Sequence, residues 1–160
     1  MASTRFGDNG VPIERLDVSA YNVPTDSPES VGTIEWDSTT LILVEATAGG
    51  KKSVGYSYAD VATAKPIKDL LTPIVVGRDA MSIPDTWFAM VRSIRNLGRP
   101  GICSMAISAV DSSLWDLKAR LLDLPLVTLL GQRRECADVY GSGGSHPILK
   151  SSYRINFAAG

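Results

Sequence analysis

Three carboxylates lie close together in the second half of the chain, at Asp111, Asp116 and Asp123. Oxygen ligands of this kind suit Mg²⁺, which requires near-octahedral coordination. Asp111 and Asp116 are five positions apart, however, and side chains at that spacing point to different faces of a helix. No fourth or fifth ligand accompanies them. We therefore interpret these acids as solvated or capping residues and predict no metal site.

The other side chains suited to nucleophilic, acid–base or metal chemistry are Cys103, Cys136 and His146. Their spacing is not that of zinc ligands, and no partner that would orient His146 as a base is identifiable. The glycine-rich run at residues 141–144 has neither a P-loop lysine nor the spacing of a dinucleotide-binding motif. The sequence therefore predicts no cofactor bound by this chain.

Composition and charge are those of an ordinary globular domain. The chain has 160 residues, of which 44% are hydrophobic, and 16 basic residues balance 17 acidic ones. This length allows one domain with a core, and the charge balance gives no indication of a nucleic-acid or membrane partner. Two cysteines make no disulfide framework, and neither a signal peptide nor a membrane span is recognisable. We expect a cytoplasmic protein.

Three strands are predicted in the first third of the chain. Apolar and polar residues alternate over residues 13–21, 39–47 and 54–58, as in half-buried strands. Residues 22–33 hold two prolines, a glycine and small polar residues, and are predicted to form a long loop. The glycine pair at residues 49–50 suits a tight hairpin. The pattern indicates an antiparallel meander.

Helices are predicted in the remainder of the domain. One spans residues 63–71, and a second runs from a cap at Ser82 to a stop at Gly98. The stretch of residues 106–131 predicts a long helix, a break at a proline and a short helix closed by glycine. Asp116 and Arg120 are spaced for an ion pair on the exposed flank of the long helix. Its apolar stripe comprises Met105, Ala109, Leu114, Leu117 and Leu121.

A meander followed by a helical bundle is an α+β fold. The order of residues in the long helix and after it resembles the signature of mandelate racemases and muconate lactonizing enzymes, in the enolase superfamily. Ser113 departs from that pattern, which usually has alanine there. The matching residues are Ala106, Ser108, Ala109, Val110, Asp111, Leu114, Asp116, Leu117, Ala119, Arg120, Pro125, Leu126, Leu129, Leu130 and Gly131.

The resemblance implies the fold of an enolase-type N-terminal capping domain over residues 13–131. A disordered arm over residues 1–12 would precede it. A remnant of the first barrel strand and its loop would follow over residues 132–144, and then a divergent tail over residues 145–160, where alternation predicts one more strand. A (β/α)₈ barrel needs about 250 residues, far more than the 29 that follow residue 131. We therefore expect a truncated or altered C-terminus.

The resemblance also implies a function. Complete relatives use a metal, usually Mg²⁺, to stabilise the enediolate that forms when the proton α to a carboxylate is removed. They include racemases, epimerases, cycloisomerases and dehydratases acting on carboxylic acids. Their acids, bases and metal ligands lie on barrel strands, so the resemblance assigns no catalytic or metal residue here. The chain alone is expected to be inactive.

Two loops of the family fold over the barrel mouth and influence specificity, and residues 23–32 and 55–60 match them. The second segment contains Tyr56 and Tyr58. A tyrosine combines an apolar ring with a hydroxyl donor, which suits ligand contact. Packing on the strand face is an equally open interpretation for both residues. Polar side chains in the first loop are further candidates, although such residues are expected in any exposed loop. The candidate substrate-lid residues are Tyr56, Tyr58, Glu29 and Ser30.

A second interpretation is a non-catalytic interaction module. Without a barrel, the surface that meets it would remain apolar and exposed, and such patches mark interfaces. The chain would then associate with a full-length homologue or form a homo-oligomer. A new small-ligand site at the two tyrosines is a third interpretation, although a lid without its barrel lacks a closed pocket.

Overall fold

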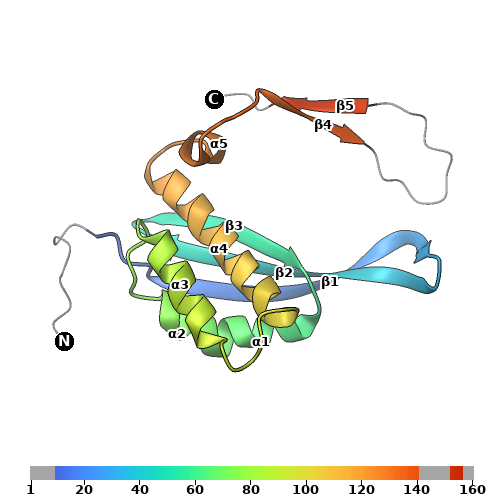
Figure 1. The fold of residues 1–160 in the computed structure, drawn as a ribbon, viewed down its shortest axis with the longest axis horizontal. Coiled ribbons are helices and arrows are strands. Elements are labelled where there is room, and N and C mark those ends of the chain that lie inside the picture. The colour runs from blue at the N-terminus through green and yellow to red at the C-terminus, as the bar shows by residue number, and fades with distance from the viewer. Residues whose placement is uncertain (1–9, 141–151, 157–160) are drawn as a thin grey trace.

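The computed structural model describes residues 10–140 and 152–156. A three-stranded sheet carries helices on one face, and a two-stranded ribbon follows the last helix (Figure 1). The elements in chain order are β1 (Arg15–Val31), β2 (Ile34–Ala48), β3 (Lys51–Tyr58), η1 (Val61–Thr63), α1 (Ala64–Pro66), η2 (Ile67–Leu71), α2 (Thr72–Val75), α3 (Ile83–Ser93), α4 (Ile102–Leu121), α5 (Leu126–Leu130), β4 (Cys136–Tyr140) and β5 (Ser152–Asn156).

The sheet is the predicted antiparallel meander, in the order β1-β2-β3. Leu16 lies opposite Ala46 in the first pair of strands, and Ala46 lies opposite Ser53 in the second. Gly49 and Gly50 turn the chain between β2 and β3 at φ values of 53° and 72°, a region that favours glycine. The α+β fold, a meander followed by helices, is therefore confirmed.

The long loop predicted for residues 22–33 is wrong. Strand β1 continues to Val31, which pairs with Ile34 across a turn at Gly32, and a register shift falls between Pro24 and Glu29. Prolines are tolerated here because β1 is an edge strand and its outward N–H groups have no ladder partner to lose. The two strands form a hairpin arm that projects beyond the helices (Figure 1).

The predicted helix over residues 63–71 begins earlier and ends later, running from η1 through α2. A proline inside a helix removes one backbone donor, and the turn immediately after Pro66, η2, is a π-helix. The Thr72 hydroxyl donates to the carbonyl of Ile67 at 2.9 Å, which adds a bond across this widened turn.

Helix α3 begins where the sequence predicts, directly after Ser82. The predicted cap is absent, however: the Ser82 side chain makes no hydrogen bond to the helix backbone. Instead, the Thr86 hydroxyl donates to the Ser82 carbonyl at 3.2 Å. The helix ends at Ser93 rather than at Gly98, and the chain turns over the intervening residues.

The core lies between α4 and the inner face of the sheet. The small residues of α4 allow close approach: a Cβ added at Gly55 of β3 would lie 2.2 Å from the carbonyl oxygen of Ala109 and 2.3 Å from the backbone nitrogen of Ser113. Met105, predicted to belong to the buried stripe, is 40% exposed, because it lies in the first turn of α4 near the end of the sheet. The buried side chains of α4 are Ala106, Ile107, Ala109, Val110, Ser113, Leu114, Leu117 and Ala119.

The arm predicted for residues 1–12 is wrong at its last residues. The backbone N–H of Val11 donates to Oδ1 of Asp79 at 3.1 Å, and the Ala80 N–H donates to the Val11 carbonyl at 2.8 Å. Pro12 forms a β-bridge with Asp79. Pairing with the fold therefore begins at Val11, and residues 1–9 lie outside the part that the structure describes.

The short C-terminal helix begins and ends where the sequence predicts. Pro125 immediately precedes α5, and Gly131 ends it at a φ of 86°. Strand β4 is present at the predicted place, and β5 is the predicted tail strand over residues 152–156. The two strands pair antiparallel, whereas neighbouring strands of a (β/α)₈ barrel are parallel. His146 and the run at residues 141–144 lie outside the described residues.

Candidate functional site

The two candidate lid tyrosines lie on the outer face of the sheet. Alternation along β3 turns Ser53 and Gly55 toward α4, where they are buried, and turns Tyr56 and Tyr58 the opposite way, where their exposed fractions are 65% and 64%. Leu43 is the cross-strand partner of Tyr56. Both hydroxyls are therefore held at the surface by a strand that is anchored on its other side.

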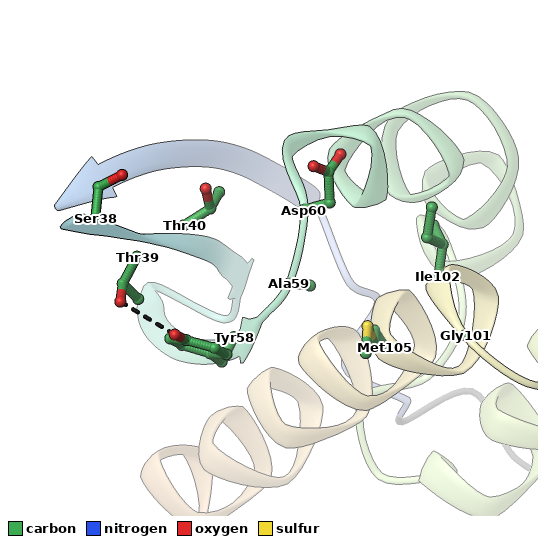
Figure 2. Close-up of a pocket in the computed structure, with 9 residues that line it drawn as sticks. All are labelled: Ser38, Thr39, Thr40, Tyr58, Ala59, Asp60, Gly101, Ile102 and Met105. Atoms are coloured by element: carbon green, nitrogen blue, oxygen red, sulfur yellow. Dashed lines mark hydrogen bonds between the residues drawn. The ribbon is translucent and has the colours of Figure 1, made fainter. Parts of the chain in front are cut away.

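Tyr58 belongs to a cavity at the end of the sheet, with a volume of about 480 Å³. Its hydroxyl lies 3.1 Å from the Thr39 hydroxyl, and this bond joins the end of β3 to β2 (Figure 2). The first turn of α4 supplies the opposite, apolar wall. The lining residues are Ser38, Thr39, Thr40, Tyr58, Ala59, Asp60, Gly101, Ile102 and Met105.

The cavity offers hydroxyl groups, one carboxylate and an apolar wall. The Asp60 carboxylate accepts the backbone N–H of Ala62 at 2.8 Å and so caps η1. Ile102 and Met105 supply the apolar side. Such a combination of a few convergent polar groups with apolar surface suits a small polar ligand with a hydrocarbon part. The arrangement can orient a ligand by hydrogen bonds.

Glu29 and Ser30 lie elsewhere, in the hairpin arm. The Trp36 indole N–H donates to Oε2 of Glu29 at 2.9 Å, across the strand pair. Ser30 lies opposite Glu35. The structure therefore brings one of the four candidate residues, Tyr58, to the cavity, while Tyr56 lies outside its lining and the other two belong to the arm.

Most of the cavity lining could not be predicted from the sequence. Thr39 and Thr40 begin a strand and read as ordinary β-branched strand residues, and Met105 reads as core because of its helical spacing. More than sixty residues of sequence separate Thr39 from Met105. Only the packing of α4 across the sheet brings them together, so no local pattern could have indicated that Thr39 and Met105 line one site with the predicted loop over residues 55–60.

The three acids of the second half are separated, and each has a different environment. Asp116 accepts the backbone N–H of Val54 at 2.9 Å and pairs with Arg120 at 2.8 Å. The ion pair is confirmed, but Asp116 is bound to the edge of the sheet rather than simply solvated. Asp111 is half-buried, and burial raises the pKa of its carboxyl. Asp123 follows α4 in the left-handed region, at a φ of 53°.

Among residues 10–136, whose side chains the structure describes, no three histidine, cysteine or acidic side chains gather in a way that could hold a metal ion. Within that range, therefore, no set of side chains offers the several oxygen ligands that Mg²⁺ takes. Over the same residues, no helix has the length and apolarity that crossing a membrane requires.

Residues 15–131 match the family described as mandelate racemase/muconate lactonizing enzyme, N-terminal domain, and the chain belongs to this family. The match begins with β1 and ends with the glycine that closes α5. It therefore covers the sheet, the helices on it and the cavity, and excludes the β4–β5 ribbon.

Three relatives illustrate the similarity. D-mannonate dehydratase of Rhizorhabdus wittichii is 37% identical over 124 residues, covering 76% of this chain and 28% of the relative. The crystal structure of a mandelate racemase/muconate lactonizing enzyme-like protein from Rubrobacter xylanophilus superposes with a TM-score of 0.82 at 55% identity, covering 85% of this chain and 38% of that one. A racemase from Streptomyces coelicolor A3(2), solved with bound magnesium, gives a TM-score of 0.78 at 32% identity, with 82% and 38% covered.

The chain spans less than two-fifths of the length of each of these relatives. The matching family is that of an N-terminal domain. These relatives include a dehydratase and a racemase, and the racemase structure contains magnesium.

Proposed function

We propose that this chain is the substrate-capping domain of an enzyme of the mandelate racemase/muconate lactonizing group. The observation that carries the proposal is the family match over residues 15–131, which coincides with the whole sheet-and-helix unit. In the complete enzyme, a proton α to a carboxylate would be removed with the help of Mg²⁺, giving racemisation, epimerisation, cycloisomerisation or dehydration. The substrate would be a carboxylic acid.

The contribution of this chain would be binding and orientation. Tyr58 and Thr39 present hydroxyls at an open cavity, opposite the apolar side chains of Ile102 and Met105. A carboxylic acid rich in hydroxyl groups suits those partners, and the dehydratase and racemase names of the relatives agree with that class. The family match concerns an N-terminal domain, so we assign this chain no chemical step and expect it to be inactive alone.

Two assays test this function. The purified chain, incubated in D₂O with Mg²⁺ and a panel of 2-hydroxy and sugar acids, should exchange no α-proton. A chimaera in which residues 15–131 replace the matching domain of a dehydratase from the family should exchange it. Metal-dependent exchange by the chain alone would refute the assignment of all chemistry to the barrel. An inactive but folded chimaera would refute the capping role.

The second candidate is a non-catalytic interaction module. It is supported by an apolar groove of about 630 Å³ beside α5, whose lining includes Leu126, Val127 and Leu130. In this function the chain would bind a full-length homologue or a second copy of itself through that groove. Light scattering coupled to size-exclusion chromatography separates the two functions. A monomer with no affinity for a full-length homologue contradicts the interaction module.

We infer a cytoplasmic setting for either function. Cys103 and Cys136 are both free thiols, as expected where glutathione and thioredoxin keep thiols reduced. The balanced charge of the chain supports neither a nucleic-acid nor a membrane partner.

A further inference from the structure

A second cavity, of about 230 Å³, lies between α3 and α4 and shares no lining residue with the Tyr58 cavity. Ser104, Ser108 and Asp111 line it from α4, at the i, i+4 and i+7 positions of one helix face. Trp87 of α3 and Arg99 of the preceding turn complete its polar side. The cavity therefore combines one carboxylate, one guanidinium and two hydroxyls.

The two charged groups are not paired with each other. None of the ion pairs found among the described residues includes Arg99 or Asp111. The Arg99 guanidinium instead lies over the Trp87 ring, 5.9 Å from its centroid. Burial alone raises the pKa of Asp111, without an opposing charge or hydrogen bond. A partly buried carboxylate that no cation pairs with is a position where a cationic ligand group would be favoured.

The hydroxyls and the apolar wall define the remaining chemistry. The Ser104 hydroxyl donates to the carbonyl of Arg99, so its oxygen remains available as an acceptor. Val91 and Ile107 form the apolar part of the lining. The volume is below the range usual for drug-sized ligands, so an occupant must be small.

We propose that this cavity binds a small zwitterionic amino acid, with the ammonium group at Asp111 and the carboxylate at Arg99. The hydrocarbon side chain of the ligand lies against Val91, Ile107 and the edge of Trp87. This site is separate from the capping function, and it assigns roles to two charged residues that the capping function does not use.

The test is calorimetric titration of the complete 160-residue chain with L-leucine. We expect saturable binding with a dissociation constant of about 1 mM or tighter. Two analogues provide the chemical controls: 4-methylpentanoate lacks the ammonium group, and L-leucinamide lacks the carboxylate. Each should bind at least about tenfold more weakly than L-leucine. Equal binding of either analogue would overturn the two-point recognition.

Variants locate the binding. Asp111→Asn and Arg99→Gln should each weaken L-leucine binding at least about tenfold, whereas Arg95→Gln, an exposed arginine outside the cavity lining, should not change it. Circular dichroism verifies that each variant is folded. In ¹H–¹⁵N spectra, L-leucine should shift the Trp87 indole signal and leave that of Trp36, in the hairpin arm, in place.

Three results would overturn the proposal: no binding at about 10 mM L-leucine, unchanged affinity in both cavity variants, or no shift of Trp87. An internal ion pair is the competing arrangement. In that case Asp111→Asn and Arg99→Gln would each lower the melting temperature of the ligand-free chain, and L-leucine would not bind.

Discussion

The hydroxyl oxygens of Ser53 and Ser113 lie 3.1 Å apart in the core and join β3 to α4. Ser53 also donates to the Ala46 carbonyl at 3.2 Å. Because a serine has one hydroxyl proton, Ser113 must be the donor in the bond to Ser53. Both residues are fully buried. The serine that departs from the family signature therefore has a partner on the facing strand.

This relationship predicts a measurable coupling between the two serines. Ser113→Ala leaves Ser53 bonded to Ala46, so it should lower the free energy of unfolding by only about 1 kcal/mol. Ser53→Ala leaves the buried Ser113 hydroxyl without its acceptor and should lower the free energy of unfolding by about 1–3 kcal/mol. Urea unfolding of both single variants and the double variant gives the coupling energy. Strict additivity would contradict the bond.

Gly55→Ala should be among the most damaging single changes in the sheet. The added methyl would lie 2.2 Å from the Ala109 carbonyl oxygen and 2.3 Å from the Ser113 nitrogen, both of them backbone atoms of α4. Overpacking of this kind costs about 1–3 kcal/mol or more. Gly50→Ala is the matched control, since no atom lies within 4 Å of its added methyl and only its φ of 72° opposes the change. Urea unfolding should show the larger loss for Gly55→Ala.

Most elements of the fold could be predicted from the sequence. The three strands, their order and the place of α4 followed from periodicity and from glycine and proline positions. The hairpin arm did not, because Pro24 and Pro28 look like loop residues unless one knows that β1 is an edge strand. Met105 looks like core by spacing, although the sheet ends before it. In both cases the position in the tertiary structure, and not the local sequence, decides whether the residues form a strand or belong to the core.

The candidate site shows the same limit. Tyr58 could be chosen from its residue type and its place at the end of a strand. Asp60 lies at the end of the predicted lid segment over residues 55–60, although it was not chosen as a candidate residue. Thr39 became part of the site only through packing, since its local sequence is that of a strand start. Glu29 was chosen for its place in a loop that is in fact a paired strand.

Asp116→Ala should destabilise the fold more than Arg120→Ala does. Asp116 accepts the backbone N–H of Val54 at the free edge of β3, and a hydrogen bond to a charged group contributes about 1.5–3 kcal/mol. Arg120 is half exposed, and its ion pair contributes at most about 1 kcal/mol. Thermal and urea unfolding measure both variants. Equal losses would show that the ion pair, rather than the strand-edge bond, is what Asp116 contributes.

Asp111→Asn should remove one contribution to the pH dependence of the free energy of unfolding. Burial raises the pKa of Asp111 in the folded chain, so between the unfolded value of about 3.9 and the raised value the folded state binds more protons. The free energy of unfolding therefore falls as pH rises through that window. The variant should match the parent chain at low pH and be more stable above the window. Urea unfolding across acidic and neutral pH measures this; a constant difference would contradict it.

Tyr58→Phe separates a role in binding from a role in folding. The Tyr58 hydroxyl is exposed and bonded to Thr39 at 3.1 Å, so its loss should change the free energy of unfolding by less than about 0.5 kcal/mol. In the chimaera with a family barrel, loss of one hydrogen bond to substrate should lower kcat/KM about two- to tenfold. Tyr56→Phe is the control, because Tyr56 lies on the same face outside the cavity. Equal effects of the two variants on kcat/KM would contradict the assignment of Tyr58 to the substrate side of the cap.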